Sequence, residues 1–276
     1  MKTYPVVLSI AGSDSGGGAG IQADIKTISA LGAFATTAIT AVTVQNTCGV
    51  SAIEPLSADI VAGQIEAVLK DLPVRAVKIG MIHSPEIVDV IAEQLQKYQP
   101  EFVVLDPVMV ATSKDKLIKD ETIEKMVKQL FPLSDLITPN LDEASCLCKK
   151  KVVTEDDMIL AARQLLQMST KAVLIKGGHL QDRQITDVFM SNKENKPYLF
   201  PSEKIDSCNL HGTGCTLSSA IATYLALDFS LYNAVSMAKK YISQAIYNGK
   251  DVVIGHGNNG AVNHFFHPQQ IKVIDL

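Results

Sequence analysis

Short apolar segments alternate with longer segments of helical periodicity along nearly the whole chain. Runs of β-branched and other apolar residues predict strands at residues 5–11, 35–44, 76–80, 102–106, 135–139 and 172–176. Most of these runs are apolar at successive positions, which is typical of strands that are buried on both faces. The pattern therefore predicts a mainly parallel sheet with helices on both sides.

The segments between the predicted strands carry the start signals of helices. Ser84 precedes a proline and a glutamate, an arrangement that favours a helix N-terminus. Thr154 and Asp157 have the spacing of a capping box, in which each side chain satisfies a backbone N–H group of the other residue. These signals place helices between the strands, as right-handed βαβ units require.

Further helices are predicted at residues 20–31, after Gly214 and at about 231–247. Strands that alternate with covering helices predict a three-layer α/β/α sandwich. No linker, repeat or low-complexity stretch divides residues 1–276, so we expect a single domain. The polar, proline-bearing stretch 190–204 predicts an exposed excursion or a hairpin.

Composition and charge narrow the functional classes. The chain has 276 residues, of which 47% are hydrophobic and 20% charged, values of an ordinary globular protein. The net charge of −4, with no basic block longer than the KKK at 149–151, argues against a nucleic-acid partner. No apolar run approaches the about 18 residues of a membrane span, and the first residues make a poor signal peptide, so we expect a cytoplasmic protein without membrane contact. The five cysteines lack the spacing of a zinc site or a disulfide framework.

A glycine-rich stretch follows the first predicted strand, at the edge of the sheet where ligands of open parallel sheets bind. Its glycines, between Gly12 and Gly20, allow a ligand to approach the backbone closely, although a flexible turn before a helix explains them equally. The turn interpretation leaves Asp14 and Asp24 without a role. The stretch has neither the G-K-[ST] of a Walker A loop nor the G-x-G-x-x-G spacing, which argues against dinucleotide binding.

Charged and polar residues also follow the later strands. Asp106 stands at the end of a buried strand, where a carboxylate can hold hydrated Mg²⁺. Asn140 and Glu143 suit the same edge of the sheet, but their spacing is also that of a helix start. Lys176 offers a compact positive charge to a phosphate, or is a solvated surface lysine.

The stretch HGTGCT begins at His211 and opens a predicted helix. The N–H groups of Gly212, Thr213, Gly214 and Cys215 are arranged as an anion site at a helix N-terminus. The thiol of Cys215 either fills a tight helix start or faces the anion and takes part in its chemistry.

Together these motifs resemble those of the ribokinase-like superfamily and, within it, the hydroxymethylpyrimidine and phosphomethylpyrimidine kinases of thiamin synthesis. The resemblance covers about residues 6–267 and rests on AGSDSGGGAGIQADIKT, TVQNT, KIGM, LDPVM, TPNLDEA, IKGGH and HGTGCT, which occur in the family's order. It implies a ribokinase-like fold and an ATP- and Mg²⁺-dependent kinase that phosphorylates the hydroxymethylpyrimidine and then its monophosphate.

The resemblance also implies roles for individual residues. It implies a pyrimidine pocket of Gly12, Asp24, Val44, Gln45, Met81 and Val108. It implies that ATP binds on the side of Asn140, Lys176 and His211, and Mg²⁺ near Asp106 and Glu143. The catalytic group would be Lys176 with an anion hole from Gly212, Thr213, Gly214 and Cys215, where Cys215 takes the position of the base. Whether Cys215 acts as a thiolate base or aligns the alcohol stays open.

Gln45 separates the alternatives. Its amide can pair with an aminopyrimidine edge, and the resemblance implies that related pyridoxal kinases lack this glutamine. A pyridoxal kinase or a dual-specificity enzyme is the nearest alternative, and a non-catalytic ligand sensor and an NAD-linked oxidoreductase are more distant ones. The resemblance further implies a homodimer, and the polar segment 109–120 suits a lid over the substrate.

Overall fold

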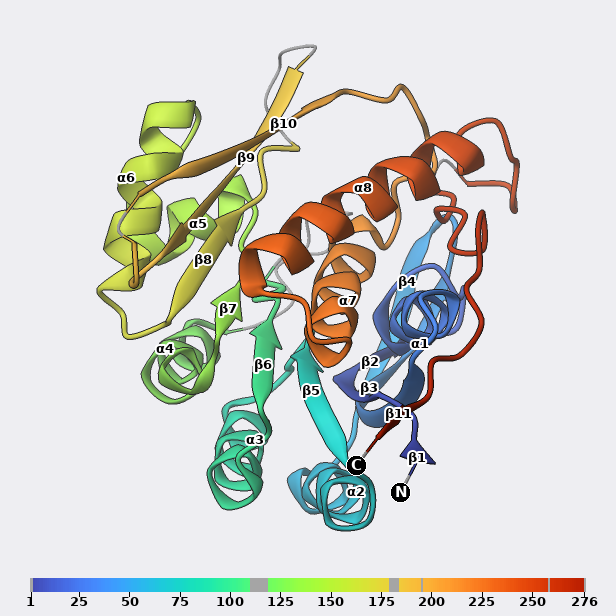
Figure 1. The fold of residues 1–276 in the computed structure, drawn as a ribbon, viewed down its shortest axis with the longest axis vertical. Helices are drawn as coiled ribbons and strands as arrows, with labels where there is room; N and C mark the ends of the chain where they lie inside the picture. The colour runs from blue at the N-terminus through green and yellow to red at the C-terminus, as the bar shows by residue number, and fades with distance from the viewer. Residues whose placement is uncertain (1, 110–118, 179–183, 195, 258, 276) are drawn as a thin grey trace.

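A computed structural model describes residues 2–109, 119–178, 184–194, 196–257 and 259–275. Its centre is a nine-stranded sheet that helices cover on both faces, which gives the three layers expected from the sequence (Figure 1). None of the helices in this part of the chain has the length and apolar character needed to cross a membrane.

The strands are arranged in the order β10-β9-β8-β7-β6-β5-β2-β3-β4. The six inner strands pair in parallel: β2 (Val6–Asp14), β3 (Phe34–Asn46), β5 (Val74–Ile79), β6 (Phe102–Leu105), β7 (Leu136–Ile137) and β8 (Ala172–Ile175). These are the strands that the apolar runs predict. A separate pair of short strands joins β1 (Lys2–Thr3) to β11 (Ile274–Asp275).

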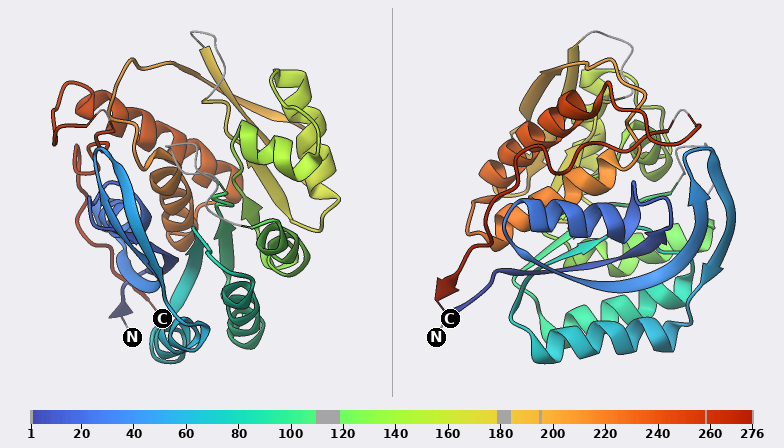
Figure 2. Two further views of the ribbon diagram at one scale, coloured as in Figure 1. Left: turned by 180° about the vertical axis from the view of Figure 1, so that it is seen from behind. Right: turned by 90° about the vertical axis from the view of Figure 1, so that its right-hand side faces the viewer.

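Antiparallel strands that the apolar runs do not predict lie at both edges. These are β4 (Gly49–Pro55), β9 (Gln184–Ser191) and β10 (Tyr198–Glu203). The polar stretch 190–204 is thus part of a hairpin, whose first strand is buried over its second half. β3 and β4 form a second hairpin that extends beyond the helical layers (Figure 2).

The helices divide into two layers. One face of the sheet carries α1 (Gly20–Ala30), α7 (Thr213–Ala226) and α8 (Leu231–Gly249). The other carries α2 (Ala58–Asp71), α3 (Pro85–Tyr98), α4 (Asp120–Gln129), a short 3₁₀ helix (Phe131–Leu133), α5 (Leu141–Cys148) and α6 (Glu155–Leu166). The expected capping boxes are present at the starts of α5 and α6, and Ser84 is the N-cap of α3.

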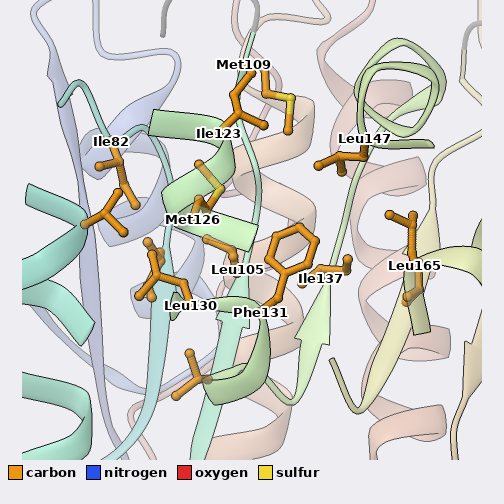
Figure 3. Close-up of a cluster of buried hydrophobic side chains, with 14 of the residues drawn as sticks. Ile82, Leu105, Met109, Ile123, Met126, Leu130, Phe131, Ile137, Leu147 and Leu165 are labelled. Atoms are coloured by element: carbon orange, nitrogen blue, oxygen red, sulfur yellow. The ribbon is translucent and has the colours of Figure 1, made fainter. Parts of the chain in front are cut away.

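Successive residues of the inner strands are buried in different layers. In β6, Val104 packs with the α1, α7 and α8 layer, whereas Val103 and Leu105 pack with the opposite layer. Figure 3 shows Leu105 and Ile137 meeting Phe131 and Met126 in that second core. Burial on both faces explains why these strands are apolar at successive positions, and it fixes the strand ends that carry the polar residues below.

Candidate active site

The carboxyl ends of β6 and β8 bring Asp106 and Lys176 together. The Nζ atom of Lys176 lies 2.7 Å from Oδ1 of Asp106, and Thr138, which follows β7, donates its hydroxyl to the same oxygen at 2.9 Å. The Asp106 side chain is 2% exposed and the Lys176 side chain is 16% exposed, so the pair is nearly buried but solvent reaches the lysine. Residues expected at neighbouring strand ends therefore form one cluster.

Mutual attraction keeps this pair charged. Burial alone would raise the pKa of Asp106, but the charges of Lys176 and Lys78 outweigh it and lower that pKa. Burial alone would lower the pKa of Lys176, but Asp106 and Glu143 raise it. The charged ammonium group of Lys176 at this edge of the sheet can thus bind an anionic ligand.

Glu143 has the helix-start role that its spacing suggests, and it lies at the same edge of the sheet. It closes the capping box of α5 by accepting the N–H of Asn140 at 2.8 Å, and its other oxygen lies 3.4 Å from the N–H of Met109. Burial raises the pKa of Glu143 to about 7, a rise that Lys176 opposes and Asp106 reinforces. A carboxyl group of this kind is ready to ionise when a cation or a further positive charge arrives.

The donors around this cluster fit hydrated Mg²⁺. No group of three or more histidine, cysteine or acidic residues suited to a metal occurs in the described part of the chain, so a metal would meet only one or two carboxylates. Mg²⁺ is bound in that way, because it keeps several waters and takes its other ligands from phosphate oxygens. The second oxygen of Asp106 has only a long hydrogen bond, 3.5 Å from the hydroxyl of Ser218, among the described residues.

The first turn of α7 lies directly beside the Asp106–Lys176 pair. A methyl group on Gly214 would stand 3.4 Å from both Asp106 Oδ2 and Lys176 Nζ. Gly212 has φ +82°, and a side chain there would overlap the carbonyl oxygen of Gly18. Only glycine suits this position, and it brings the turn against the glycine-rich loop.

The expected anion hole needs one correction. The N–H of Thr213 already donates to the carbonyl of Leu210 at 3.2 Å, because the chain closes a tight turn before the helix. Among the described residues, the N–H groups of Gly212, Gly214 and Cys215 have no acceptor. These three, rather than four, are free to hold an anion at the helix N-terminus.

Cys215 is protonated in the ligand-free protein at neutral pH. Desolvation raises the pKa of its thiol to about 11, and the negative charges of Asp24 and Asp106 add to the rise. Lys78 and a hydrogen bond from the N–H of Gly20 oppose it. A thiolate would therefore need a change in this environment, such as a new positive charge or the loss of a negative one.

Asp24 is a second correction. It has no exposed surface, and its oxygens lie 2.8 and 2.9 Å from Nζ of Lys78, which is equally buried. The hydroxyl groups of Ser9 and Ser219 donate to the same carboxylate. Because α1 turns this residue towards α7 and the sheet, Asp24 is an internal ion-pair partner in this structure and not a lining residue of a pocket.

Of the other residues expected in the pyrimidine pocket, Gly12 and Met81 lie together at the start of the glycine-rich loop. A methyl group on Gly12 would stand 2.5 Å from Cε of Met81, so these two are in contact. Val108 follows Asp106 and is half-buried. Val44 is 59% exposed on the β3–β4 hairpin, outside this group.

His211 connects the start of α7 to the glycine-rich loop. Its Nε2 atom lies 2.8 Å from Oδ2 of Asp14 and 3.2 Å from Nε2 of Gln45, on the side of the glycine-rich loop. The residue expected beside the nucleotide thus faces the residue expected to read the pyrimidine. The sequence separation between His211 and these partners hides the contact from any local pattern.

Several residues of the site were missed from the sequence although signals existed. Lys78 interrupts an apolar strand, and a buried lysine needs an acidic partner. Asp187 accepts the N–H of Gly177 at 2.8 Å and pairs with Lys239 at 2.7 Å, which anchors the segment just after Lys176. Asp187 is the one acidic residue within an otherwise apolar half-strand, which was a usable sign.

Residues 110–118, most of the segment expected as a lid, lie outside the described residues. A cavity of about 500 Å³ opens at the opposite edge of the sheet, lined by Thr3, Pro73, Arg75, Asp228, Ile274 and Asp275. Two of its charged residues satisfy each other, since Arg75 pairs with Asp228 at 2.5 Å.

Known proteins resemble this chain along nearly its whole length. The family described as phosphomethylpyrimidine kinase matches residues 14–263. The hydroxymethylpyrimidine/phosphomethylpyrimidine kinase of Rhizobium meliloti is 46% identical over 94% of this chain and 97% of that protein.

Solved structures agree with this similarity. The crystal structure of phosphomethylpyrimidine kinase from Clostridium difficile is 46% identical, covers 87% of this chain and 99% of its own, and has a TM-score of 0.78. The ADP complex of Bacillus subtilis pyridoxal kinase is 33% identical, covers 95% and 98%, and has a TM-score of 0.87. The ribokinase-like fold expected from the sequence is confirmed. With its family matched over most of its length and a relative 46% identical over nearly all of it, the chain belongs to the phosphomethylpyrimidine kinase family.

Proposed function

We propose that this protein transfers the γ-phosphoryl group of ATP to the alcohol of 4-amino-5-hydroxymethyl-2-methylpyrimidine, and then phosphorylates the resulting monophosphate. The observation that carries the proposal is the placement of the Lys176 ammonium group beside the unpaired N–H groups at the start of α7. Phosphoryl transfer passes through a loose transition state with charge on the phosphoryl oxygens, so it depends mainly on such preorganised positive charge.

Each group of the site has a part in this reaction. Lys176 attracts the phosphate chain, and the N–H groups of Gly214 and Cys215 hold the charge that develops on the transferred group. Asp106 and Glu143 would hold Mg²⁺, which when bound neutralises phosphate charge. Ionisation of Glu143, whose pKa is about 7, is favoured in that state.

In this proposal Cys215 is the group that receives the alcohol proton. Its thiol starts with a pKa of about 11, and the phosphate of the second substrate adds negative charge that opposes ionisation. We therefore propose that the thiol loses its own proton to solvent when the bound ligands bring positive charge to the site, and that the resulting thiolate accepts the alcohol proton as the phosphoryl group leaves ATP. A general base of this kind contributes about 10²- to 10⁴-fold to the rate.

Gln45 selects the ring. Its amide has a donor and an acceptor, which match a ring nitrogen and the exocyclic amine of an aminopyrimidine. A pyridoxal kinase, or an enzyme with both activities, is the second candidate, favoured by the close structural similarity to the Bacillus subtilis pyridoxal kinase.

The deciding experiment measures ADP release with the hydroxymethylpyrimidine, its monophosphate and pyridoxal in parallel. We expect turnover with both pyrimidines and at least about tenfold lower kcat/KM with pyridoxal. In Gln45→Met, the KM for the pyrimidine should rise at least about tenfold while the KM for ATP changes less than about twofold. Turnover with pyridoxal alone would replace the proposal by its alternative, and an unchanged pyrimidine KM in the variant would remove Gln45 from ring recognition.

We also propose that the protein is a homodimer that acts in the cytoplasm. Within the described residues the β3–β4 hairpin ends the sheet, because β4 pairs only with β3, and the hairpin exposes Val42, Val44 and Val50, a surface suited to a second copy. All five cysteines are free thiols, in keeping with a reducing compartment. Sedimentation equilibrium of the protein and of Val44→Asp tests the dimer, because a dimer formed through the hairpin should dissociate in the variant.

A further inference from the structure

The glycine-rich loop satisfies its own N–H groups. The carboxylate of Asp14 accepts the N–H of Gly16 at 2.8 Å with one oxygen, and those of Gly18 and Ala19 at 3.0 and 2.8 Å with the other. Asp14 is 3% exposed. The N–H groups that such loops commonly offer to a phosphate are thus already bound to a side chain of the same loop.

His211 joins this arrangement to the start of α7. Its Nε2 atom lies 2.8 Å from Asp14, and a methyl group on Gly18 would stand 2.5 Å from its ring. Burial alone would raise the pKa of Asp14, but hydrogen bonds from His211 and from Ala19 and Gly16 lower it. Asp14 is therefore a carboxylate at neutral pH, and it holds the residue that directly precedes Gly212.

The same ring nitrogen meets the residue proposed to read the pyrimidine. Nε2 of His211 is 3.2 Å from Nε2 of Gln45 as well as 2.8 Å from the Asp14 carboxylate. One nitrogen carries at most one proton, and the charge-assisted bond to the carboxylate is the stronger use of it. The amide N–H of Gln45 then faces the N–H of His211, so two donors meet. A ligand that offers an acceptor to Gln45 relieves this conflict, and the surroundings of the His211 ring change with it.

We propose that Asp14 and His211 form a positioning pair that couples occupation of Gln45 by the pyrimidine to the geometry of the anion-binding turn 212–215. The inference rests on the proposed function. His211 touches the ring-reading residue through its side chain, and its backbone leads into the N–H groups that hold the phosphoryl charge. A bound pyrimidine thereby aligns the turn, whereas an alcohol that does not engage Gln45 leaves it unaligned.

The kinetic test is a double-mutant cycle between positions 211 and 45. His211→Phe removes the donor but keeps a ring against Gly18, and His211→Gln keeps an N–H at a similar reach. We expect His211→Phe to lower kcat for the pyrimidine at least about tenfold with the KM for ATP changed less than twofold, and His211→Gln to recover most of the loss. In a Gln45→Met background, His211→Phe should cost less than about threefold. Equal losses in both backgrounds would overturn the coupling.

A ligand-free test separates this inference from the proposed function. In ¹⁵N-labelled protein, Gln45→Met should shift the amide resonances of Gly212 and Gly214, and the same substitution in His211→Phe should leave them in place. Circular dichroism of each variant checks that it is folded, and His211→Gln should transmit the shift as wild type does. If Gln45→Met leaves the Gly212 and Gly214 resonances unshifted when His211 is present, the coupling is overturned. Absence of ADP release with every alcohol overturns only the proposed function.

Discussion

Two pairs of a carboxylate and a lysine flank α7, and they differ mainly in depth. Asp24 and Lys78 are both fully buried, whereas Lys176 of the second pair is 16% exposed beside a 2% exposed Asp106. Adjacent serines of α7 serve them: Ser219 donates to Asp24 at 2.5 Å, and Ser218 lies 3.5 Å from Asp106.

The difference in depth separates structure from chemistry. Lys78 lies within β5 and has no exposed surface, and its ammonium group contacts both oxygens of Asp24. Its charge is therefore used inside the protein. Lys176 follows the end of β8 and keeps one side towards the site. Both pairs act on Cys215, since Lys78 lowers its pKa and Asp24 and Asp106 raise it. An aspartate and a lysine thus hold the sheet to α7 in the Asp24–Lys78 pair, whereas in the Asp106–Lys176 pair they are available to a ligand.

The largest effect is expected from Lys78→Met. It leaves the Asp24 carboxylate buried without a counter-charge, which costs about 3–5 kcal/mol of the free energy of unfolding. Urea denaturation measures it, and the double variant Asp24→Asn with Lys78→Met should recover most of the loss. A single variant within about 1 kcal/mol of wild type would contradict a holding role for the internal pair.

Lys176→Met should instead act mainly on the rate. It removes a charge that stabilises the transferred phosphoryl group, so kcat for ADP release should fall about 10²- to 10³-fold. Its urea midpoint should change less than half as much as that of Lys78→Met, because Thr138 still donates to Asp106 and water reaches the open side. Equal stability losses for the two lysines would erase the distinction between the pairs.

The thiol between the two pairs gives a pH-dependent comparison. With a pKa of about 11, Cys215 is about 0.1% thiolate at pH 8, against about a quarter for a free cysteine. The higher intrinsic nucleophilicity of a high-pKa thiolate offsets part of this, so iodoacetamide should modify Cys215 at least about tenfold more slowly than exposed Cys48. Because the pKa is raised, the rate for Cys215 should keep rising beyond pH 10. Peptide mass spectrometry measures both rates, and a plateau for Cys215 below pH 9 would show a lower pKa.

The smallest effect is expected at the surface. Lys171 pairs with Asp135 at 2.7 Å but is 58% exposed, so Lys171→Met should change the free energy of unfolding by less than about 1 kcal/mol. Its kcat should stay within about twofold of wild type. This variant is the matched control. An unchanged stability and kcat would show that the stability loss in Lys78→Met and the rate loss in Lys176→Met come from the positions of those lysines and not from the loss of a lysine charge as such.

The sequence predicts the inner sheet and the strand-end cluster for the same physical reason. Strands buried on both faces must be apolar throughout, so the first polar residue after each marks the ligand edge, as Asp106 and Lys176 do. β4 has mostly exposed residues and no continuous apolar run, so nothing marks it.

The contacts that the sequence does not predict depend on the direction of a side chain or on distance along the chain. The position of Asp24 in a predicted helix does not tell which neighbour it faces, and only the packing of α1 on α7 turns it inward. His211 meets Asp14 across 197 positions, and the role of Thr213 depends on one hydrogen bond of a tight turn. Such contacts arise from tertiary structure, which local spacing does not encode.

The close approach of Gly212 to Gly18 has a consequence for biosynthesis. The glycine-rich loop leaves the ribosome early and is carried by a central strand, but the turn that completes the site belongs to the last quarter of the chain. Domains generally fold as units, and α7 packs on β2, β5 and β6 of the sheet. The ability to handle a phosphoryl group therefore appears only after the last quarter of the chain has been synthesised and α7 has docked against the loop.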